Sequence, residues 1–259
     1  MRSEVTPELS VVVPAHNSGD VIDRTIAELS ERLAGAQAEV IVVENGSTDD
    51  TLARCLRLAE QWGCSGVTLS VLQSDKGMGN ALRTGVLASH GASVLLTADD
   101  LPFGFDDLDQ LDRLTSAPGT PIPPVLVGSK AHPDSVVERG ALRGILTWGF
   151  SVLIHAILGV RTRDPQGTLI VDGNLAREVA RHAVEPGYLF STELIYIAER
   201  VGIRPTEVPV RLRASHRDHA SRLKASDMAA MAIGLLRMRA RHHARWRPGS
   251  IKVRPPSVP

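Results

Sequence analysis

Cysteine is scarce in this sequence, because Cys55 and Cys64 are the two cysteines among 259 residues. Two thiols cannot build the disulfide framework of a small secreted domain, so we expect a chain that works in the reducing cytoplasm. Residues Met1–Glu8 lack the basic start and apolar stretch of a secretory signal, and we expect none. There is no internal repeat. The length then predicts one large domain, or one domain with an appendage.

The chain also lacks net charge, since 29 Lys and Arg residues balance 29 Asp and Glu residues. The two signs are unevenly distributed. From Arg200 onward there are 14 basic and 3 acidic residues, whereas the preceding 199 residues carry 15 and 26. A basic C-terminal quarter on an acidic body indicates a face that meets phosphates, a lipid surface or nucleic acid, or else a solvated helical tail. We expect no nucleic acid partner.

No apolar run is long enough to predict a membrane span. Gly144–Val160 has no formal charge apart from a protonated His155, but its 17 residues fall short of the roughly 20 that cross a bilayer. This segment is typical of a buried core helix, or of a helix in the membrane interface with flanking arginines. A second helix, at about Ser226–Trp246, begins apolar and becomes basic. The tail, Pro248–Pro259, is proline-rich and predicted to be disordered.

Strand and helix signals alternate along the first half of the chain. Apolar runs predict buried strands, and the segments between them have helical spacing of apolar residues. This alternation favours a doubly wound, largely parallel sheet, whose ligands bind at the carboxyl ends of the strands. The predicted strands are Glu8–Pro14, Glu39–Val43, Val67–Gln73 and Ser93–Thr97, and their ends place His16, Glu44, Lys76 and Asp99 where chemistry is expected.

Four motifs follow these strands in order, within Val13–Asn17, Val43–Ser47, Lys76–Asn80 and Ala98–Leu101. Together they resemble glycosyltransferase family 2, and within it the polyprenyl-phosphate sugar synthases. The resemblance covers about residues 8–225. It implies an α/β fold of the GT-A-like nucleotide-diphospho-sugar transferase type and transfer of a hexose from a GDP- or UDP-sugar, with a polyprenyl phosphate as the expected acceptor. The expected organisation is a transferase domain at 1–225, a basic amphipathic helix at 226–247 and a tail at 248–259.

The donor site implied by the resemblance lies mostly on these motifs. Glu44 ends a strand, where its carboxylate can accept a hydrogen bond from a ring N–H of uracil or guanine; a helix N-terminal charge or a solvated acid is the alternative. Lys76 supplies a positive charge beside Gly77 and Gly79, where the backbone can approach a ligand. The nucleotide-sugar-binding residues carried over are Pro14, Ala15, His16, Asn17, Glu44, Asn45, Ser47, Lys76, Asp99, Arg213, Arg217 and Arg222.

Asp99 and Asp100 predict a site for Mg²⁺ or Mn²⁺. A departing diphosphate needs charge neutralisation, and carboxylates at a strand end suit such ions. The family has Asp-x-Asp here, whereas Ala98 replaces the first Asp, so Asp100 corresponds to the second and is the expected catalytic ligand. The alternative is that the two acids cap the next helix.

The acceptor decides which further groups are needed. A lipid phosphate is already ionised and needs only cations, for which Lys130, Arg139 and Arg143 are the candidates. A hydroxyl acceptor would need a carboxylate base, and Glu193 is the candidate, with a structural ion pair as the alternative. The sequence therefore leaves three readings: a peripheral enzyme on the inner face of the plasma membrane, a soluble transferase, or a nucleotide-sugar-binding protein without catalysis.

Overall fold

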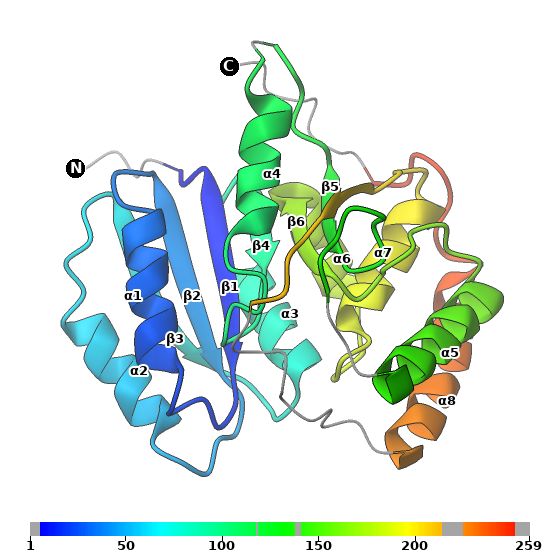
Figure 1. The fold of residues 1–259 in the computed structure, drawn as a ribbon, viewed down its shortest axis with the longest axis horizontal. Helices are drawn as coiled ribbons and strands as arrows, with labels where there is room; N and C mark the ends of the chain where they lie inside the picture. The colour runs from blue at the N-terminus through cyan, green and yellow to red at the C-terminus, as the bar shows by residue number, and fades with distance from the viewer. Residues whose placement is uncertain (1–5, 118, 138–140, 214–224, 252–259) are drawn as a thin grey trace. The chain divides into compact units, whose positions relative to one another are not determined.

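The computed structural model describes residues 6–117, 119–137, 141–213 and 225–251 (Figure 1). For residues 141–148 and 225–230, which begin two helices, it describes the backbone only. The chain forms two compact units, each built from two separate segments. Unit 1 contains Met1–Leu101 and Leu169–Phe190, and unit 2 contains Pro102–Thr168 and Ser191–Pro259. The sequence-based division at residue 225 stays a prediction.

Unit 1 contains a sheet with the strand order β3-β2-β1-β4-β6. Its strands are β1 (Leu9–Ala15), β2 (Ala38–Glu44), β3 (Val67–Gln73), β4 (Ser93–Leu96) and β6 (Thr168–Asp172). The pairs β1–β2, β2–β3 and β1–β4 are parallel, whereas β4 and β6 are antiparallel. The largely parallel sheet predicted from the alternating pattern is therefore confirmed for this unit.

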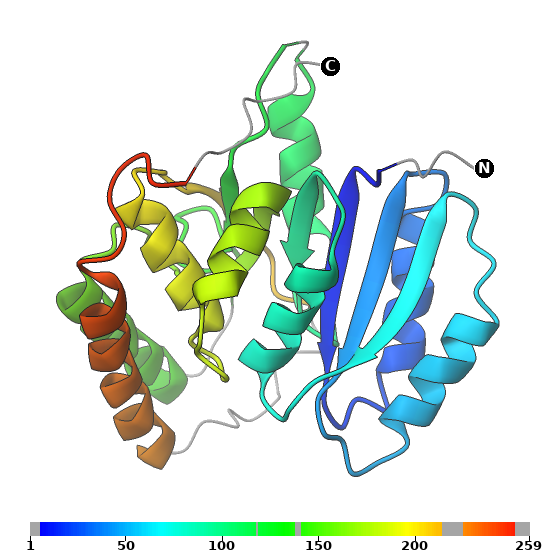
Figure 2. The same ribbon diagram turned by 180° about the vertical axis from the view of Figure 1, so that it is seen from behind.

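Helices cover both faces of this sheet, as a comparison of Figures 1 and 2 shows. Helices α1 (Ile22–Arg32) and α2 (Thr51–Glu60) lie over one face, and α3 (Met78–Ala88) lies over the other beside α6 (Gly173–His182). Because both faces are covered, the sequences of the central strands are nearly continuous apolar runs and do not alternate between apolar and polar residues.

Burial follows the position of each strand in the sheet. The valines of β1, Val11–Val13, are completely buried, whereas in the edge strand β3 only Val67 is buried and the other residues are partly or fully exposed. Helix α1 buries Ile22, Ile26 and Leu29, which share one face because they recur at helical spacing. The carboxyl ends of β1, β2 and β4 consequently project from a rigid core.

In unit 2, the strands β5 (Val125–Ser129) and β7 (Thr206–Pro209) pair in parallel. Two shorter helices belong with them, α4 (Asp106–Thr115) and α7 (Phe190–Arg200). Val136 forms an isolated parallel bridge with Arg211 next to this pair.

Two long helices of unit 2 pack side by side, α5 (Ala141–Leu158) and α8 (Ala225–His242). They confirm the two helices predicted near Gly144–Val160 and Ser226–Trp246, although α8 ends at His242 and Trp246 lies beyond the turn that follows it. The predicted tail lies largely outside the described residues, which end at Ile251. Within the part of the chain that is described, no helix combines the length and apolar character needed to cross a membrane.

An acid is buried in the first turn of α4. Asp107 is 3% exposed, and its Oδ1 accepts a hydrogen bond from the backbone N–H of Leu108 at 2.8 Å. Burial raises the pKa of Asp107 to about 6, because the charged carboxylate is poorly solvated there, and hydrogen bonding opposes that rise only in part. The folded protein therefore binds a proton at Asp107 more tightly than the unfolded chain does.

We expect Asp107→Asn to stabilise the protein at neutral pH. The unfolded carboxyl ionises near its ordinary pKa of about 4, whereas the folded one stays protonated to about 6. The contribution of Asp107 to the free energy of unfolding is therefore fully present below pH ~4 and falls by up to about 3 kcal/mol as pH rises through 6. Thermal unfolding of wild type and variant, measured between these pH values, should show a difference that grows with pH. Asp109→Asn, at an exposed position of the same helix, is the control, and a pH-independent difference for Asp107→Asn would contradict the assignment.

Candidate functional site

The loops after β1 and β2 are joined by hydrogen bonds. Asn17 donates its backbone N–H to Ser47 Oγ at 3.0 Å, and its side-chain Oδ1 accepts from the backbone N–H of Thr48 at 2.8 Å. The backbone N–H of Asn45 donates to the carbonyl of Ala15 at 3.0 Å. Asn17 has a φ of 52°, in the left-handed region that asparagine tolerates better than most residues. Four of the predicted donor-site residues thus lie together at one edge of the sheet.

Glu44 ends β2 as a buried carboxylate, with an exposed fraction of 4%. Its Oε1 accepts from the backbone N–H of Ser47, and its Oε2 accepts from Gln73 Nε2 at 3.2 Å. Burial pushes the pKa of Glu44 upward, but the hydrogen bonds from Ser47 and Gln73 outweigh burial, and the net effect lowers the pKa. Glu44 is therefore an ionised hydrogen-bond acceptor near neutral pH.

Ser18 was missed by the sequence analysis, although it connects the loops at this edge. Its hydroxyl donates to Asp99 Oδ2 and accepts from the backbone N–H of His16 at 2.9 Å. Its own backbone N–H donates to Thr51 Oγ1 at 2.8 Å. The hydroxyl of Thr25 also donates to the backbone carbonyl of Asp99 at 2.6 Å. A serine next to a predicted site loop was the available signal, but it is also ordinary turn chemistry.

The acidic pair after β4, Asp99 and Asp100, is the site predicted for Mg²⁺ or Mn²⁺. The described residues include no group of three or more His, Cys, Asp and Glu side chains that could hold a metal ion. Mg²⁺, however, is commonly held by one or two carboxylates together with phosphate oxygens of a substrate. Asp99 and Asp100 are two such carboxylates. The next residue, Leu101, has a φ of 43°, which is a strained backbone conformation for a bulky residue.

Lys76 lies against the turn after β2. Gly46 has a φ of 77°, and a Cβ added to it would lie 3.5 Å from the Cβ of Lys76. Glycine is favoured here because this conformation is strained for other residues. The close packing brings the Lys76 backbone next to the Glu44–Ser47 segment.

The glycines after Lys76 pack closely against the backbone of another segment of the chain, residues 185–187. The Pro186 carbonyl accepts from the backbone N–H groups of Gly79 at 2.9 Å and Asn80 at 3.2 Å. A Cβ on Gly79 would lie 2.7 Å from the Gly187 carbonyl oxygen and closer still to that of Glu185. The first N–H groups of α3 thus have an internal partner. The close backbone approach expected for a ligand is made here by the 185–187 loop.

Glu193 lies in a buried pair on α7. Its Oε1 is 2.6 Å from His242 Nε2, and both side chains have no exposed surface. Trp246 Nε1 donates to His242 Nδ1 at 3.2 Å. Because an indole N–H can only donate, Nδ1 must be the unprotonated nitrogen, and Nε2–H donates to Glu193. The pair fastens the end of α8 to α7, and a role for Glu193 as a base stays a prediction.

The predicted phosphate-binding cations of unit 2 are only partly described. Lys130 Nζ lies 2.9 Å from Asp164 Oδ2, donates to the Gln166 carbonyl at 3.0 Å and sits 5.8 Å from the centre of the Phe103 ring. The Arg213 guanidinium lies beside Gly104, where an added Cβ would come within 3.1 Å of its nitrogens. Arg139, Arg217, Arg222 and the side chain of Arg143 lie outside the described residues.

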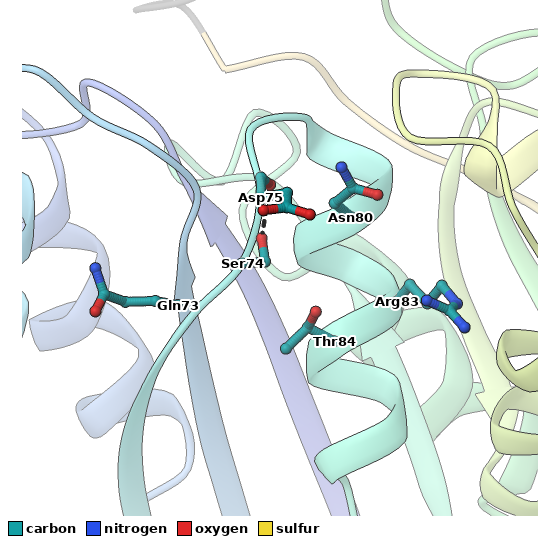
Figure 3. Close-up of a pocket in the computed structure, with 6 residues that line it drawn as sticks. All are labelled: Gln73, Ser74, Asp75, Asn80, Arg83 and Thr84. Atoms are coloured by element: carbon teal, nitrogen blue, oxygen red, sulfur yellow. Dashed lines mark hydrogen bonds between the residues drawn. The ribbon is translucent and has the colours of Figure 1, made fainter.

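A polar hollow of about 340 Å³ lies between the end of β3 and the first turns of α3 (Figure 3). Gln73 and Arg83 point away from each other there, with Asn80 and Thr84 on the helix between them. The complete lining consists of Gln73, Ser74, Asp75, Asn80, Arg83 and Thr84. None of these residues was predicted from the sequence, but Gln73 links the hollow to Glu44.

The chain is similar in sequence to known glycosyltransferases. A family model described as glycosyl transferase family 2 matches residues 10–113. A dolichyl-phosphate beta-glucosyltransferase of Drosophila melanogaster is 32% identical over 216 residues, which are 79% of this chain and 66% of that protein. The enzyme of the same name from Mus musculus is 30% identical, over 79% of this chain and 67% of its own length. The chain thus spans about two thirds of these relatives.

Solved structures show the same fold at lower identity. The glucosyl-3-phosphoglycerate synthase of Mycobacterium tuberculosis in complex with UDP has a TM-score of 0.60 and 21% identity, covering 94% of this chain and 82% of that one. A complex of that protein with Mn²⁺, UDP and glucosyl-3-phosphoglycerate gives a TM-score of 0.60 at 22% identity, with the same coverage. The α/β fold of the GT-A type is therefore confirmed.

We expect Gly79→Ala to destabilise the protein by about 1–3 kcal/mol, a typical cost of overpacking. Alanine normally favours a helix over glycine, but here its Cβ would meet three backbone atoms of the 185–187 loop. Gly187→Ala is the matched control, because an added Cβ there meets nothing within 4 Å. Chemical denaturation of both variants measures the difference. A Gly79→Ala protein as stable as the control would show that the loop does not depend on this contact.

Proposed function

This chain belongs to glycosyltransferase family 2, and from that premise we propose that it transfers a hexose from a UDP-sugar to a polyprenyl phosphate. The observation that carries the proposal is its similarity, at 32% and 30% identity over 79% of the chain, to relatives named dolichyl-phosphate beta-glucosyltransferase. The sequence motifs and the polar edge of the unit 1 sheet lie within residues 10–113, which the family model matches. Glucose is accordingly the hexose we propose.

The proposed donor site uses the carboxyl edge of unit 1. Glu44, held ionised, would accept the single ring N–H of uracil, and Lys76 would oppose the charge of the diphosphate. The support for uridine comes from the solved structures of similar fold that hold UDP. Asn17, Asn45 and Ser47 would shape the loops around the nucleotide through the hydrogen bonds that already join them.

We propose that Asp100, with Asp99 beside it, holds Mg²⁺ or Mn²⁺. The ion would neutralise charge on the departing UDP when bound. The contribution of the chain is to fix Asp99 before substrate arrives. The Ser18 hydroxyl orients the Asp99 carboxylate, and the Thr25 hydroxyl holds the Asp99 backbone, so little reorganisation is needed during the reaction.

The proposed acceptor makes a general base unnecessary. An oxygen of the lipid phosphate is already an anion, so it can attack the anomeric carbon while the bond to UDP breaks and its electron pair leaves with UDP. The configuration at that carbon would invert. Lys130 would contribute a cation, since its ammonium has three N–H groups and Asp164 and Gln166 engage two. The complete burial of Glu193 also favours this acceptor over a hydroxyl.

A peripheral attachment to the cytoplasmic face of the membrane would bring this domain to its lipid acceptor. Exposed apolar side chains lie on both long helices of unit 2, with Val152 on α5 and Ile233 and Leu236 on α8. The basic end of α8 follows directly, with Arg237 exposed. Apolar side chains beside arginines suit an anionic leaflet.

The function is tested by incubating the protein with UDP-[¹⁴C]glucose, a polyprenyl phosphate and Mn²⁺, and measuring label in the lipid extract. We expect lipid-linked glucose from the wild type and a loss on the order of 100-fold in Asp100→Asn, because several kcal/mol of charge stabilisation are removed. Asp112→Asn, at an exposed position on α4, is the control and should match the wild type. Binding of UDP without transfer to any acceptor would instead favour a non-catalytic nucleotide-sugar-binding protein.

Membrane attachment predicts sedimentation with vesicles rich in phosphatidylserine, weakened by salt. Replacing Arg237 and Arg247 together by Gln should lower the apparent affinity by roughly 30-fold, at about 1 kcal/mol for each charge near the surface. Arg24→Gln with Arg32→Gln, on α1 of unit 1, is a charge-matched control. Equal losses in both double variants would indicate a nonspecific charge effect and contradict attachment through α8.

A further inference from the structure

We propose that Gln73 is a positioning residue for recognition of the donor base, acting by holding the Glu44 carboxylate in place. This inference rests on the proposed function, because it assumes that Glu44 receives the base of a nucleotide donor. It adds a residue that neither the motifs nor the family resemblance assigned to the site. Gln73 would not touch the base, and its effect would pass through Glu44.

The geometry follows from strand register. Glu44 and Gln73 are the last residues of β2 and β3, and they are paired across these parallel strands. Gln73 Nε2 lies 3.2 Å from Glu44 Oε2. A carboxylate can only accept hydrogen bonds, so the NH₂ group of the glutamine must face it, and the orientation of the amide is fixed.

The two oxygens of Glu44 are held in different ways. Oε1 accepts from the backbone N–H of Ser47, which no ordinary substitution at that position removes. Oε2 depends on a side chain, Gln73, at the exposed edge strand β3. Without the amide, Oε2 would lose this donor, and the carboxylate would be held by the hydrogen bonds of Gly46 and Ser47 alone. Gln73 is therefore the adjustable part of this contact.

The chemical consequence concerns the state of Glu44 as well as its direction. An ionised carboxylate is a stronger acceptor for a base N–H than a protonated one, and each carboxylate oxygen can accept a second hydrogen bond beyond the internal one. Donation from Gln73 favours the ionised form, and it is one of the hydrogen bonds that keep the pKa of Glu44 low despite burial. Losing that donation would raise the pKa of Glu44 and let a proton compete with the base at higher pH.

Because Gln73 is exposed and lines the hollow in Figure 3, it can be changed without opening the core. Gln73→Met keeps much of the side-chain length and removes the donor. Gln73→Glu replaces the donor by a second carboxylate, which would disfavour ionisation of Glu44 further. Gln61→Met, at an exposed glutamine just after α2, is the matched control.

The experiment is calorimetric titration of UDP into each protein between about pH 5 and pH 8. The readout is the ratio of the variant Kd to the wild-type Kd, because titration of UDP itself is common to all proteins and cancels. We expect Gln73→Met to weaken binding by about 2–10-fold at pH 7.5, the range of one hydrogen bond, with a ratio that grows as pH falls. Gln73→Glu should show a larger ratio, whereas Gln61→Met should stay at one.

A Glu44→Gln background separates positioning from a general surface effect. There the carboxylate is absent, so adding Gln73→Met should change UDP affinity little. A ratio of one for Gln73→Met at every pH would overturn this inference while UDP binding by the wild type upholds the donor site. Failure of the wild type to bind UDP would instead overturn the proposed function, and this inference with it.

Discussion

The hydrogen bond from the Ser18 hydroxyl to the Asp99 carboxylate joins the loop after β1 to the acidic segment after β4. The same serine receives the backbone N–H of His16 and donates its own to Thr51 at the start of α2. Parallel strands end at a shared edge, and their loops leave backbone groups that need partners. The Ser18 hydroxyl serves one such backbone group in its own loop and at the same time holds a carboxylate of the loop after β4. Asp99 of the candidate site is therefore held by the fold before any ligand binds.

Two buried acids of this chain have net pKa shifts of opposite sign, because their hydrogen-bond donors differ. Glu44 and Asp107 are both nearly inaccessible to water. Donors reach both oxygens of Glu44, and its pKa falls despite the burial. Asp107 has weaker compensation, and burial raises its pKa to about 6. The first arrangement produces an ionised acceptor suited to recognition, and the second produces a buried acid that costs stability as it ionises.

Internal contacts also occupy groups that local sequence patterns associate with ligands. The Pro186 carbonyl takes the first N–H groups of α3, so Gly77 and Gly79 serve chain packing next to Lys76. Glu193 pairs with His242, which accepts a hydrogen bond from Trp246, and the pair fastens α8 to α7. In both places the partner comes from a distant part of the sequence. Lys76 and the acids after β4 keep the positions expected of them at the carboxyl edge of the sheet.

The sequence by itself determined the alternation of strands and helices in unit 1, the end of β3 at Gln73 and the placement of Glu44 and Asp99 after strands, because apolar periodicity and strand ends are local properties. The ordered motifs likewise identified the family. Only the tertiary structure decided that Ser18 holds Asp99, that Gln73 holds Glu44, and that β6 returns antiparallel beside β4. It also decided that each unit is assembled from two separate segments. These features depend on contacts between residues up to 81 positions apart, and nothing in the neighbouring sequence records which distant donor reaches a carboxylate.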